Sequence, residues 1–209
     1  MILSHSKKFI FIKTRKCGGT SIQNVLMEFC NEGDFVTKGF RNLMNKGRNP
    51  FEEFSSLDEI KKYSTIDLND YFKFGLARNP FSITLSRYLY QIRMGRLRET
   101  PTKDNFNSWV KNIYFNPGKQ FNYQGDGTRN LLFDSEGNKI VEFIARLENI
   151  ESDFEYIKEK LNLDKNVKLK KDNVSNILNI NYRDWMDDES KDLVSNNFKF
   201  EIDYFNYKF

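Results

Sequence analysis

The chain has 209 residues, 39% of them hydrophobic and 15% aromatic, and a formal net charge of +4 at pH 7. This length is enough for one sizeable core, so we expect a single domain over residues 1–209, and the small positive charge favours an anionic ligand but does not by itself indicate nucleic acid. Two cysteines are too few for a disulfide framework, and the four-residue apolar run near the N-terminus is too short for a signal peptide or a membrane span, so we expect a cytoplasmic protein.

The first predicted elements are a short strand, a glycine-containing turn and a helix. Residues 9–12 are Phe-Ile-Phe-Ile and predict a buried strand, and residues 13–21 are Lys-Thr-Arg-Lys-Cys-Gly-Gly-Thr-Ser, with a helix expected from Thr20 or Ser21. This order lets the backbone approach an anion and directs the first N–H groups and the positive end of the helix dipole toward it. We therefore interpret the turn as a phosphate-binding loop.

The lysine of this loop has an unusual position. In the nucleoside-triphosphatase motif G-x-x-x-x-G-K-[ST] the lysine directly precedes the Ser or Thr, whereas Lys16 lies upstream of both Gly18 and Gly19. The spacing argues against an ATP-binding loop and for a different phosphate chemistry.

The next part of the chain predicts mainly loop. Residues 31–50 are rich in Gly and Asn and predict a loop with a short strand at residues 35–37. Residues 57–63 predict a short helix, because Ser56 and Glu59 have the spacing of a capping box.

A second strand-to-helix turn follows. Residues 71–77 predict a buried strand that ends at Arg78-Asn79-Pro80, and residues 81–94 have helical periodicity. Pro80 suits the first turn of that helix, where its missing N–H costs nothing. The stretch from Arg87 to Arg98 contains four arginines and no acid, which indicates either a site for an acidic acceptor or a solvated helix end.

The later segments repeat the alternation of strand and helix. Residues 139–146 predict a third strand, and residues 150–163 an amphipathic helix. The alternation predicts an α/β fold with a P-loop-like parallel sheet of about four to five strands, flanked by helices on both faces. Ligands of such sheets bind at the carboxyl ends of the strands, where both cationic turns are expected.

The two turns together resemble those of the sulfotransferases that use 3′-phosphoadenosine-5′-phosphosulfate (PAPS). The turns are Lys16-Cys17-Gly18-Gly19-Thr20-Ser21 and Arg78-Asn79-Pro80, the latter with Ser86 eight residues after Arg78. The closest resemblance is to the carbohydrate sulfotransferases of sulfotransferase family 2 and their bacterial relatives. Residues 146–150, 173–175, 182–185 and 202–207 resemble later segments of that family, so the resemblance spans nearly the whole chain.

This resemblance implies roles for individual residues. Lys16 is implied to be catalytic, contacting the 5′-phosphate and the bridging oxygen of the donor. The first turn as a whole is implied to bind the 5′-phosphosulfate through Arg15, Lys16, Cys17, Gly18, Gly19, Thr20 and Ser21. Arg78 and Ser86 are implied to hold the 3′-phosphate, and Asn173 and Ser175 the far side of the nucleotide. PAPS is then the co-substrate, adenosine 3′,5′-bisphosphate the product, and no metal is expected.

The chain departs from the family pattern at several positions. Arg15 replaces the usual Pro and Cys17 the usual Thr, and neither change removes a backbone N–H. Ile83 stands where a second arginine is common, and Arg87 is a possible replacement although it points elsewhere on an ideal helix.

The catalytic base is the largest departure. Phe54 stands where relatives often have a histidine, so Glu53 is the nearest candidate base, with Glu52 and His5 as alternatives. His5 precedes the first strand, on the side away from its carboxyl end, and is therefore better explained as a surface residue.

The sequence therefore predicts a PAPS-dependent sulfotransferase that acts by in-line displacement on an acceptor hydroxyl, with a saccharide as the expected acceptor. Two alternatives remain open: a P-loop-type small-molecule kinase, and a non-catalytic module that binds an anionic glycan or nucleic acid. The absent Gly-Lys-Ser/Thr argues against the first, and mild basicity with many aromatic residues suggests the second. The sequence does not identify the acceptor or the oligomeric state.

Overall fold

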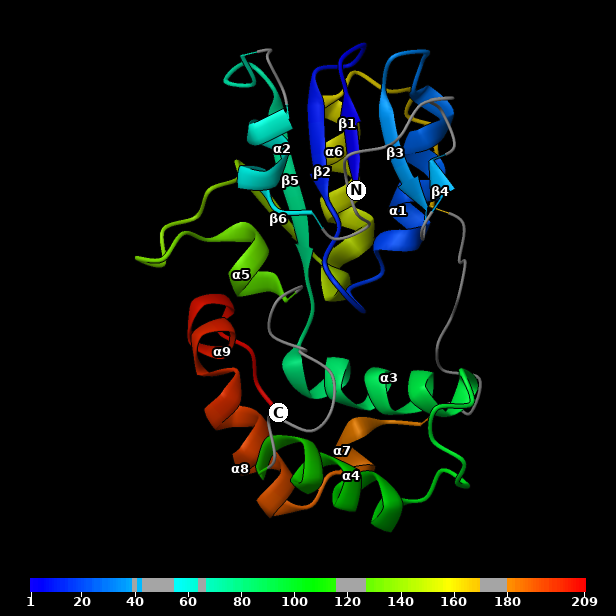
Figure 1. Cartoon of the computed structure of the whole chain (residues 1–209), viewed down its shortest axis with the longest axis vertical. Helices are drawn as coiled ribbons and strands as arrows, with labels where there is room; N and C mark the ends of the chain where they lie inside the picture. The colour runs from blue at the N-terminus through cyan, green and yellow to red at the C-terminus, as the bar shows by residue number, and fades with distance from the viewer. Residues whose placement is uncertain (39–40, 43–54, 64–66, 116–126, 170–179) are drawn as a thin grey trace. The chain divides into compact units, whose positions relative to one another are not determined.

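The computed structural model describes residues 1–38, 41–42, 55–63, 67–115, 127–169 and 180–209 (Figure 1). The chain divides into two compact units. The first comprises Met1–Ala77 and Gln124–Asn173, and the second Arg78–Tyr123 and Val174–Phe209. Each unit is described by itself below, and the single domain over residues 1–209 stays a prediction.

A sheet forms the centre of the first unit. Within the described residues it has six strands in the order β4-β3-β1-β2-β5-β6. The strands are β1 (Ile2–Ser4), β2 (Phe9–Ile12), β3 (Phe35–Lys38), β4 (Arg41–Asn42), β5 (Phe72–Ala77) and β6 (Phe143–Arg146). The neighbours β2, β5 and β6 are parallel, whereas β1 is antiparallel to both β2 and β3, and β4 is antiparallel to β3.

The predicted α/β class and the helix-flanked sheet are confirmed, and antiparallel strands extend the parallel core of β2, β5 and β6 on one side. The extra antiparallel strand arises from a hairpin between β1 and β2, whose turn has Lys8 in a left-handed conformation with φ 52°. The three residues of β1 are too few to show a strand period, so their pairing is set by the hairpin.

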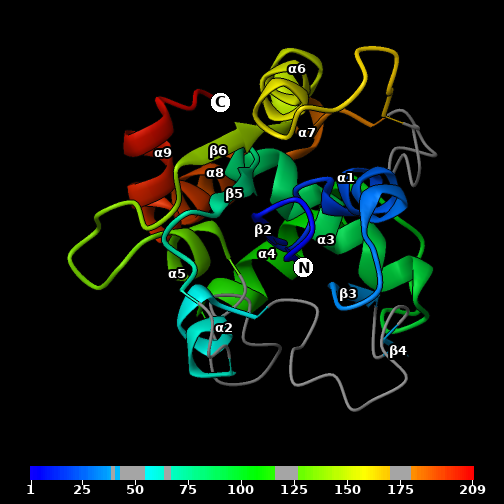
Figure 2. The same cartoon turned by 90° about the horizontal axis from the view of Figure 1, so that it is seen from above.

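Helices cover both faces of this sheet. They are α1 (Gly19–Leu26), η1 (Met27–Phe29), α2 (Leu57–Tyr63), α5 (Thr128–Leu132), η2 (Leu147–Asn149) and α6 (Ile150–Lys160). Figures 1 and 2 show α1 and α6 on one face and α2 and α5 on the other. The predicted capping box of α2 is confirmed, since Ser56 N donates to Glu59 Oε2 at 2.7 Å and Glu59 N to Ser56 Oγ at 3.2 Å.

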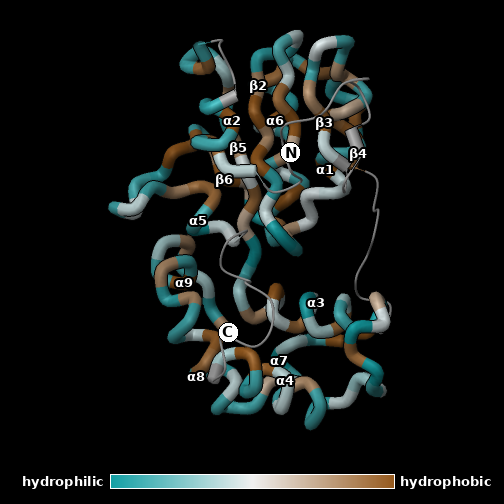
Figure 3. The backbone as a smooth tube through the Cα atoms, in the orientation of Figure 1, coloured by the Kyte–Doolittle hydropathy of each residue, from teal (hydrophilic) through white to brown (hydrophobic). Residues whose placement is uncertain are grey.

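Aromatic side chains fill the face that α6 covers. Phe74 stacks on Phe11 and on Phe72, each with ring centroids 5.2 Å apart, and Phe143 lies 4.5 Å from Tyr156 of α6. On the other face, a Cβ at Gly75 would clash with the side chain of Leu132 of α5. Figure 3 shows β2 as a continuous hydrophobic strand. This packing explains why the sheet's short strands are stable.

Helices build the second unit. They are α3 (Pro80–Arg93), α4 (Lys103–Phe115), α7 (Tyr182–Trp185), α8 (Asp188–Asn197) and α9 (Lys199–Phe205). The prediction that Pro80 lies in the first turn of a helix is confirmed: α3 begins at Pro80, and the Oδ1 of its N-cap Asn79 accepts from Phe81 N at 3.0 Å. The core of this unit contains Phe81, Tyr88, Phe106, Trp109 and Val110, among others.

Candidate active site

The turn after β2 has the geometry of an anion-binding loop. β2 ends at Ile12, and α1 begins at Gly19, with Gly18 as its N-cap in a left-handed conformation with φ 81° and ψ 8°. Lys16 is also left-handed, with φ 62°, which non-glycine residues seldom adopt. Two left-handed residues so close together turn the chain sharply toward the N-terminus of α1, and strain of this kind is common at ligand sites.

Both glycines of the turn are also required by close packing. A Cβ at Gly18 would lie 2.6 Å from Cδ1 of Leu147, the first residue of η2, and a Cβ at Gly19 would lie 2.8 Å from Cγ of Lys13. The sequence suggested that glycines let an anion approach, whereas these contacts show that they also let neighbouring side chains approach.

Two contacts fix the turn at the carboxyl edge of the sheet. Thr14 is buried, and its Oγ1 donates to the backbone oxygen of Leu76 in β5 at 2.6 Å. Leu147, which packs on Gly18, directly follows Arg146, and Arg146 is paired with Ala77 in the register of β5 and β6. The first cationic turn therefore lies at the sheet edge where parallel sheets bind ligands.

The side chains of this turn differ in exposure. Arg15, Lys16, Thr20 and Ser21 are half-buried. Cys17 is buried instead, and its Sγ lies 3.4 Å from the backbone oxygen of Arg15. The Cys17 thiol is therefore shielded from solvent.

The second predicted turn lies in the second unit. The Nε and Nη2 of Arg78 donate to Ser82 Oγ at 3.0 and 2.7 Å. Ser86, which lies one turn further along α3, is buried. Arg78 and Ser82 are four residues apart, a spacing that is visible in the sequence. The contact between them becomes evident only once the structure shows that α3 begins at Pro80.

Ile83 and Arg87 also lie on α3. Both are buried, and the guanidinium carbon of Arg87 lies 5.8 Å from the centre of the Phe198 ring. Arg87 thus contributes to the core of the second unit.

His5 lies away from the loop. It is in the turn that precedes β2, and its Nδ1 is 2.9 Å from the hydroxyl oxygen of Tyr71, the residue before β5. These are the amino ends of β2 and β5, whereas Lys16 follows the carboxyl end of β2. The other base candidates, Glu52 and Glu53, lie outside the described residues, as do Phe54, Asn173 and Ser175.

A carboxylate organises the amino edge near His5. Asp34 accepts hydrogen bonds from the hydroxyls of Ser4 and Ser6 and from the backbone N–H groups of His5, Ser6 and Asn31. Burial alone would raise the pKa of Asp34, but these hydrogen bonds outweigh it and lower the pKa from 3.8. Burial, followed by the negative charge of Asp34, raises the pKa of the Cys30 thiol to about 12. This cluster is a structural anchor at the edge opposite the loop.

Other features are separate from the predicted site. A cavity of about 410 Å³ lies in the second unit between α4 and residues 184–187, and no predicted site residue lines it. In the part of the chain that the structure describes, no three His, Cys, Asp or Glu side chains are grouped so that they could hold a metal ion. None of the described helices is both long and apolar enough to cross a membrane.

Comparison with known proteins gives one family. A family model described as "Sulfotransferase family" matches residues 1–208. No curated protein matches the chain.

Proposed function

Because the chain belongs to the sulfotransferase family, we propose that it transfers a sulfuryl group from PAPS to an acceptor hydroxyl, with a carbohydrate as the acceptor. Family membership supports sulfuryl transfer in general. The observation that most supports a phosphosulfate donor is the turn after β2, in which left-handed Lys16 and Gly18 lead into the N-terminus of α1.

The proposed reaction is an in-line displacement. The acceptor oxygen attacks sulfur and forms the new S–O bond, the bond from sulfur to the phosphate oxygen breaks, and adenosine 3′,5′-bisphosphate leaves with that electron pair. A base takes the proton of the acceptor hydroxyl. Negative charge develops on the departing phosphate oxygen, so Lys16 and the N–H groups at the start of α1 would stabilise the transition state there.

We assign the rest of the donor site from the family pattern. Arg15, Cys17, Gly18, Gly19, Thr20 and Ser21 would bind the 5′-phosphosulfate. Arg78 and Ser86 would bind the 3′-phosphate, and Asn173 and Ser175 the far side of the nucleotide. Glu53, or Glu52, would be the base. No metal is needed in this proposal, because cations of the chain stabilise the leaving group.

We add Ser82 to the 3′-phosphate site. Its Oγ accepts both hydrogen bonds from Arg78, which holds the guanidinium in one orientation. A hydroxyl that accepts still has its own O–H to donate, so Ser82 and Arg78 would both donate to one phosphate.

A transfer assay tests the proposal. Purified protein is incubated with ³⁵S-labelled PAPS and a panel of saccharides, phenols and alcohols, and we expect label on a saccharide. Binding is measured in parallel, because a ligand specific for the folded state raises the melting temperature. Stabilisation by ATP and Mg²⁺ in preference to adenosine 3′,5′-bisphosphate would support a kinase, and insensitivity to both nucleotides would support a binding module.

A further inference from the structure

The cavity between α4 and residues 184–187 has the size of a small-molecule site. Its volume of about 410 Å³ falls in the range of about 300–1,000 Å³ that is common for such sites. Lys103, Asn107 and Lys111 recur every four residues along α4, so one polar stripe of this helix lines the cavity. A helix stripe that faces a neighbouring segment is usually apolar, and this polar wall therefore has a role other than core packing.

The wall is held in place by a buried amide. Asn107 Nδ2 donates to the backbone oxygen of Trp185 at 2.8 Å, and Asn107 Oδ1 accepts from Asp187 N at 3.0 Å. The ring of Trp185 packs against Phe106, with ring centroids 6.2 Å apart, and Trp185 is half-buried. Asn107 therefore fixes the backbone on both sides of Met186, so Trp185 lines the cavity from a defined position.

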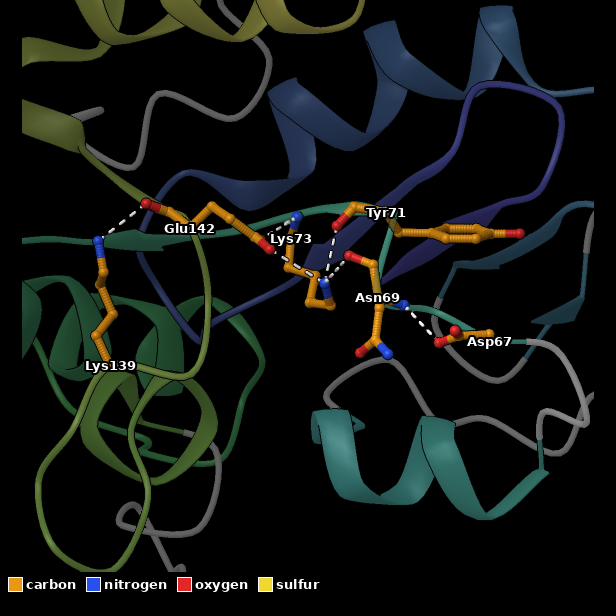
Figure 4. A network of polar contacts seen from close by, with 6 residues as sticks. All are labelled: Asp67, Asn69, Tyr71, Lys73, Lys139 and Glu142. Atoms are coloured by element: carbon orange, nitrogen blue, oxygen red, sulfur yellow. Dashed lines mark hydrogen bonds and ion pairs between the residues drawn. The ribbon is translucent and has the colours of Figure 1, made fainter.

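Lys111 belongs to this support. Its Nζ lies 2.6 Å from Glu189 Oε2 and 3.0 Å from Asp187 Oδ2, and the hydrogen bonds to Glu189 and then to Asp187 raise the pKa of Lys111. Figure 4 shows a comparable pair in the first unit, where Lys73 Nζ donates to Glu142 Oε1 at 3.1 Å. Lys111 thus has its charge compensated within the fold, and its role at the cavity is structural.

Three other charged side chains of the wall face solvent. Lys103, Asp104 and Asp184 are exposed, and no described residue forms an ion pair or a side-chain hydrogen bond with any of them. An ammonium only donates hydrogen bonds and a carboxylate only accepts them. An anion attracted by Lys103 would be repelled by the two aspartates, and an amine would meet the opposite conflict. A hydroxyl group carries no charge and both donates and accepts, so a ligand with several hydroxyls suits all three side chains.

Trp185 adds an apolar surface to these polar groups. A sugar ring has the same division, since its C–H groups form an apolar face and its hydroxyls lie around the rim, and a tryptophan ring offers a large, rigid surface for that face. We propose that this cavity binds a saccharide without net charge, which stacks on Trp185 and forms hydrogen bonds with Lys103, Asp104 and Asp184. None of the residues predicted for the donor site lines the cavity, so this inference goes beyond the proposed function and does not depend on it.

Tryptophan fluorescence tests the inference directly. The chain has two tryptophans, and Trp109 lies in the core of the second unit, so Trp109→Phe leaves Trp185 as the only reporter. Its emission is titrated, without any sulfuryl donor, with two matched pairs of disaccharides. Neutral cellobiose is compared with anionic cellobiuronic acid, and neutral N,N′-diacetylchitobiose with its cationic deacetylated form. We expect a saturable change with at least one neutral disaccharide and binding of its charged counterpart that is weaker by about three-fold or more. Calorimetry of the wild type repeats the titration without a substitution.

Two substitutions locate the binding. Asp184→Ala should weaken binding of the neutral disaccharide by about five-fold or more, the effect of losing a hydrogen bond to a charged group. Trp185→Ala, measured by calorimetry, should weaken it by about ten-fold. Asp192→Ala is the matched control, because Asp192 is an exposed aspartate of α8 that does not line the cavity, and it should leave the affinity within about two-fold.

Melting temperatures show whether each variant is folded, and the exposed Asp184 carries the test if Trp185→Ala is unstable. The inference is overturned if neither neutral disaccharide binds, if the charged counterpart binds more tightly, or if Asp184→Ala behaves like Asp192→Ala. Sulfuryl transfer from PAPS by a protein that fails this test would leave the proposed function standing, because the two are measured separately.

Discussion

Gly18 and Leu147 are in direct contact: a Cβ added to Gly18 would lie 2.6 Å from Leu147 Cδ1. The turn that follows β2 is therefore supported by the segment that follows β6, although nearly 130 residues separate them along the chain. Gly18 also has φ 81°, so a side chain there meets both backbone strain and a steric clash.

Gly18→Ala should lower the free energy of unfolding by about 2–4 kcal/mol and weaken donor binding, because the clash adds to the strain. Urea unfolding and nucleotide calorimetry measure the two effects. Gly33→Ala is the matched control, since Gly33 has φ 96° but nothing within 4 Å of an added Cβ. It should show the strain alone, about 1 kcal/mol.

Leu147→Ala in the Gly18→Ala background should then recover part of the lost stability, because it makes room for the added methyl group. If Gly33→Ala is as destabilising as Gly18→Ala, or Leu147→Ala brings no recovery, the packing against η2 is not what fixes the turn.

Ser82→Ala should weaken binding of adenosine 3′,5′-bisphosphate by about three- to ten-fold, because Arg78 loses the group that orients its guanidinium. Adenosine 5′-phosphosulfate lacks the 3′-phosphate, so its affinity should stay the same. Arg78→Lys should weaken binding of adenosine 3′,5′-bisphosphate to a similar extent, because a lysine ammonium cannot reproduce the two guanidinium N–H groups that both donate to Ser82 Oγ.

The measurement is calorimetry with both nucleotides, and the melting temperature reports whether Ser82→Ala leaves the fold intact. A Ser82→Ala protein that loses affinity for both nucleotides equally would exclude a specific role at the 3′-phosphate.

Asp34→Asn should lower the free energy of unfolding at pH 7 by about 1–3 kcal/mol, since the amide places an N–H₂ group where donors of Ser4 and Ser6 now point. The pKa of Asp34 is lowered in the folded protein, so its stabilising effect is present above the unfolded value of 3.8 and is lost as the pH falls through the lower folded value.

Urea unfolding at pH 7 and pH 3 tests this. The difference in the free energy of unfolding between wild type and Asp34→Asn should be smaller at pH 3 than at pH 7. Asp70 is exposed, so Asp70→Asn should change the free energy of unfolding little at either pH. A difference that grows as the pH falls has the wrong sign for a carboxylate that is stabilised by hydrogen bonds.

The parts of the fold and of the site that the sequence predicts are those whose signals come from residues close together in the chain. The β2 turn follows from an apolar tetrapeptide and a glycine pair, and the start of α3 from Pro80 after a buried strand. Capping by Ser56 and Glu59 is equally local, because both partners lie within one helical turn. Such signals need no knowledge of the rest of the chain.

Other features depend on contacts that are distant in sequence. β1 exists only as the partner of β2 and β3, and the third strand begins at Phe143 rather than at residue 139, where Lys139 pairs instead with Phe133. Lys13 looks like a solvated lysine in the sequence, and only its contacts with Gln23 and Gly19 show that it is buried. Likewise, the sequence offers Cys17 as a ligand contact, whereas the structure buries its side chain.

The central claim is that the turn after β2 carries out PAPS-dependent sulfuryl transfer with Lys16 as its catalytic cation. The most direct measurement is the rate of ³⁵S transfer from labelled PAPS to the saccharide that the panel identifies, compared between wild type, Lys16→Ala and Lys8→Ala. Lys8 is the matched control, because it is also a left-handed lysine next to β2, but at the amino end. We predict that Lys16→Ala lowers kcat by about 100-fold or more and that Lys8→Ala leaves kcat within about two-fold, since Lys16 and not Lys8 is proposed to stabilise the leaving oxygen. A folded Lys16→Ala protein that transfers sulfate at the wild-type rate would contradict the claim.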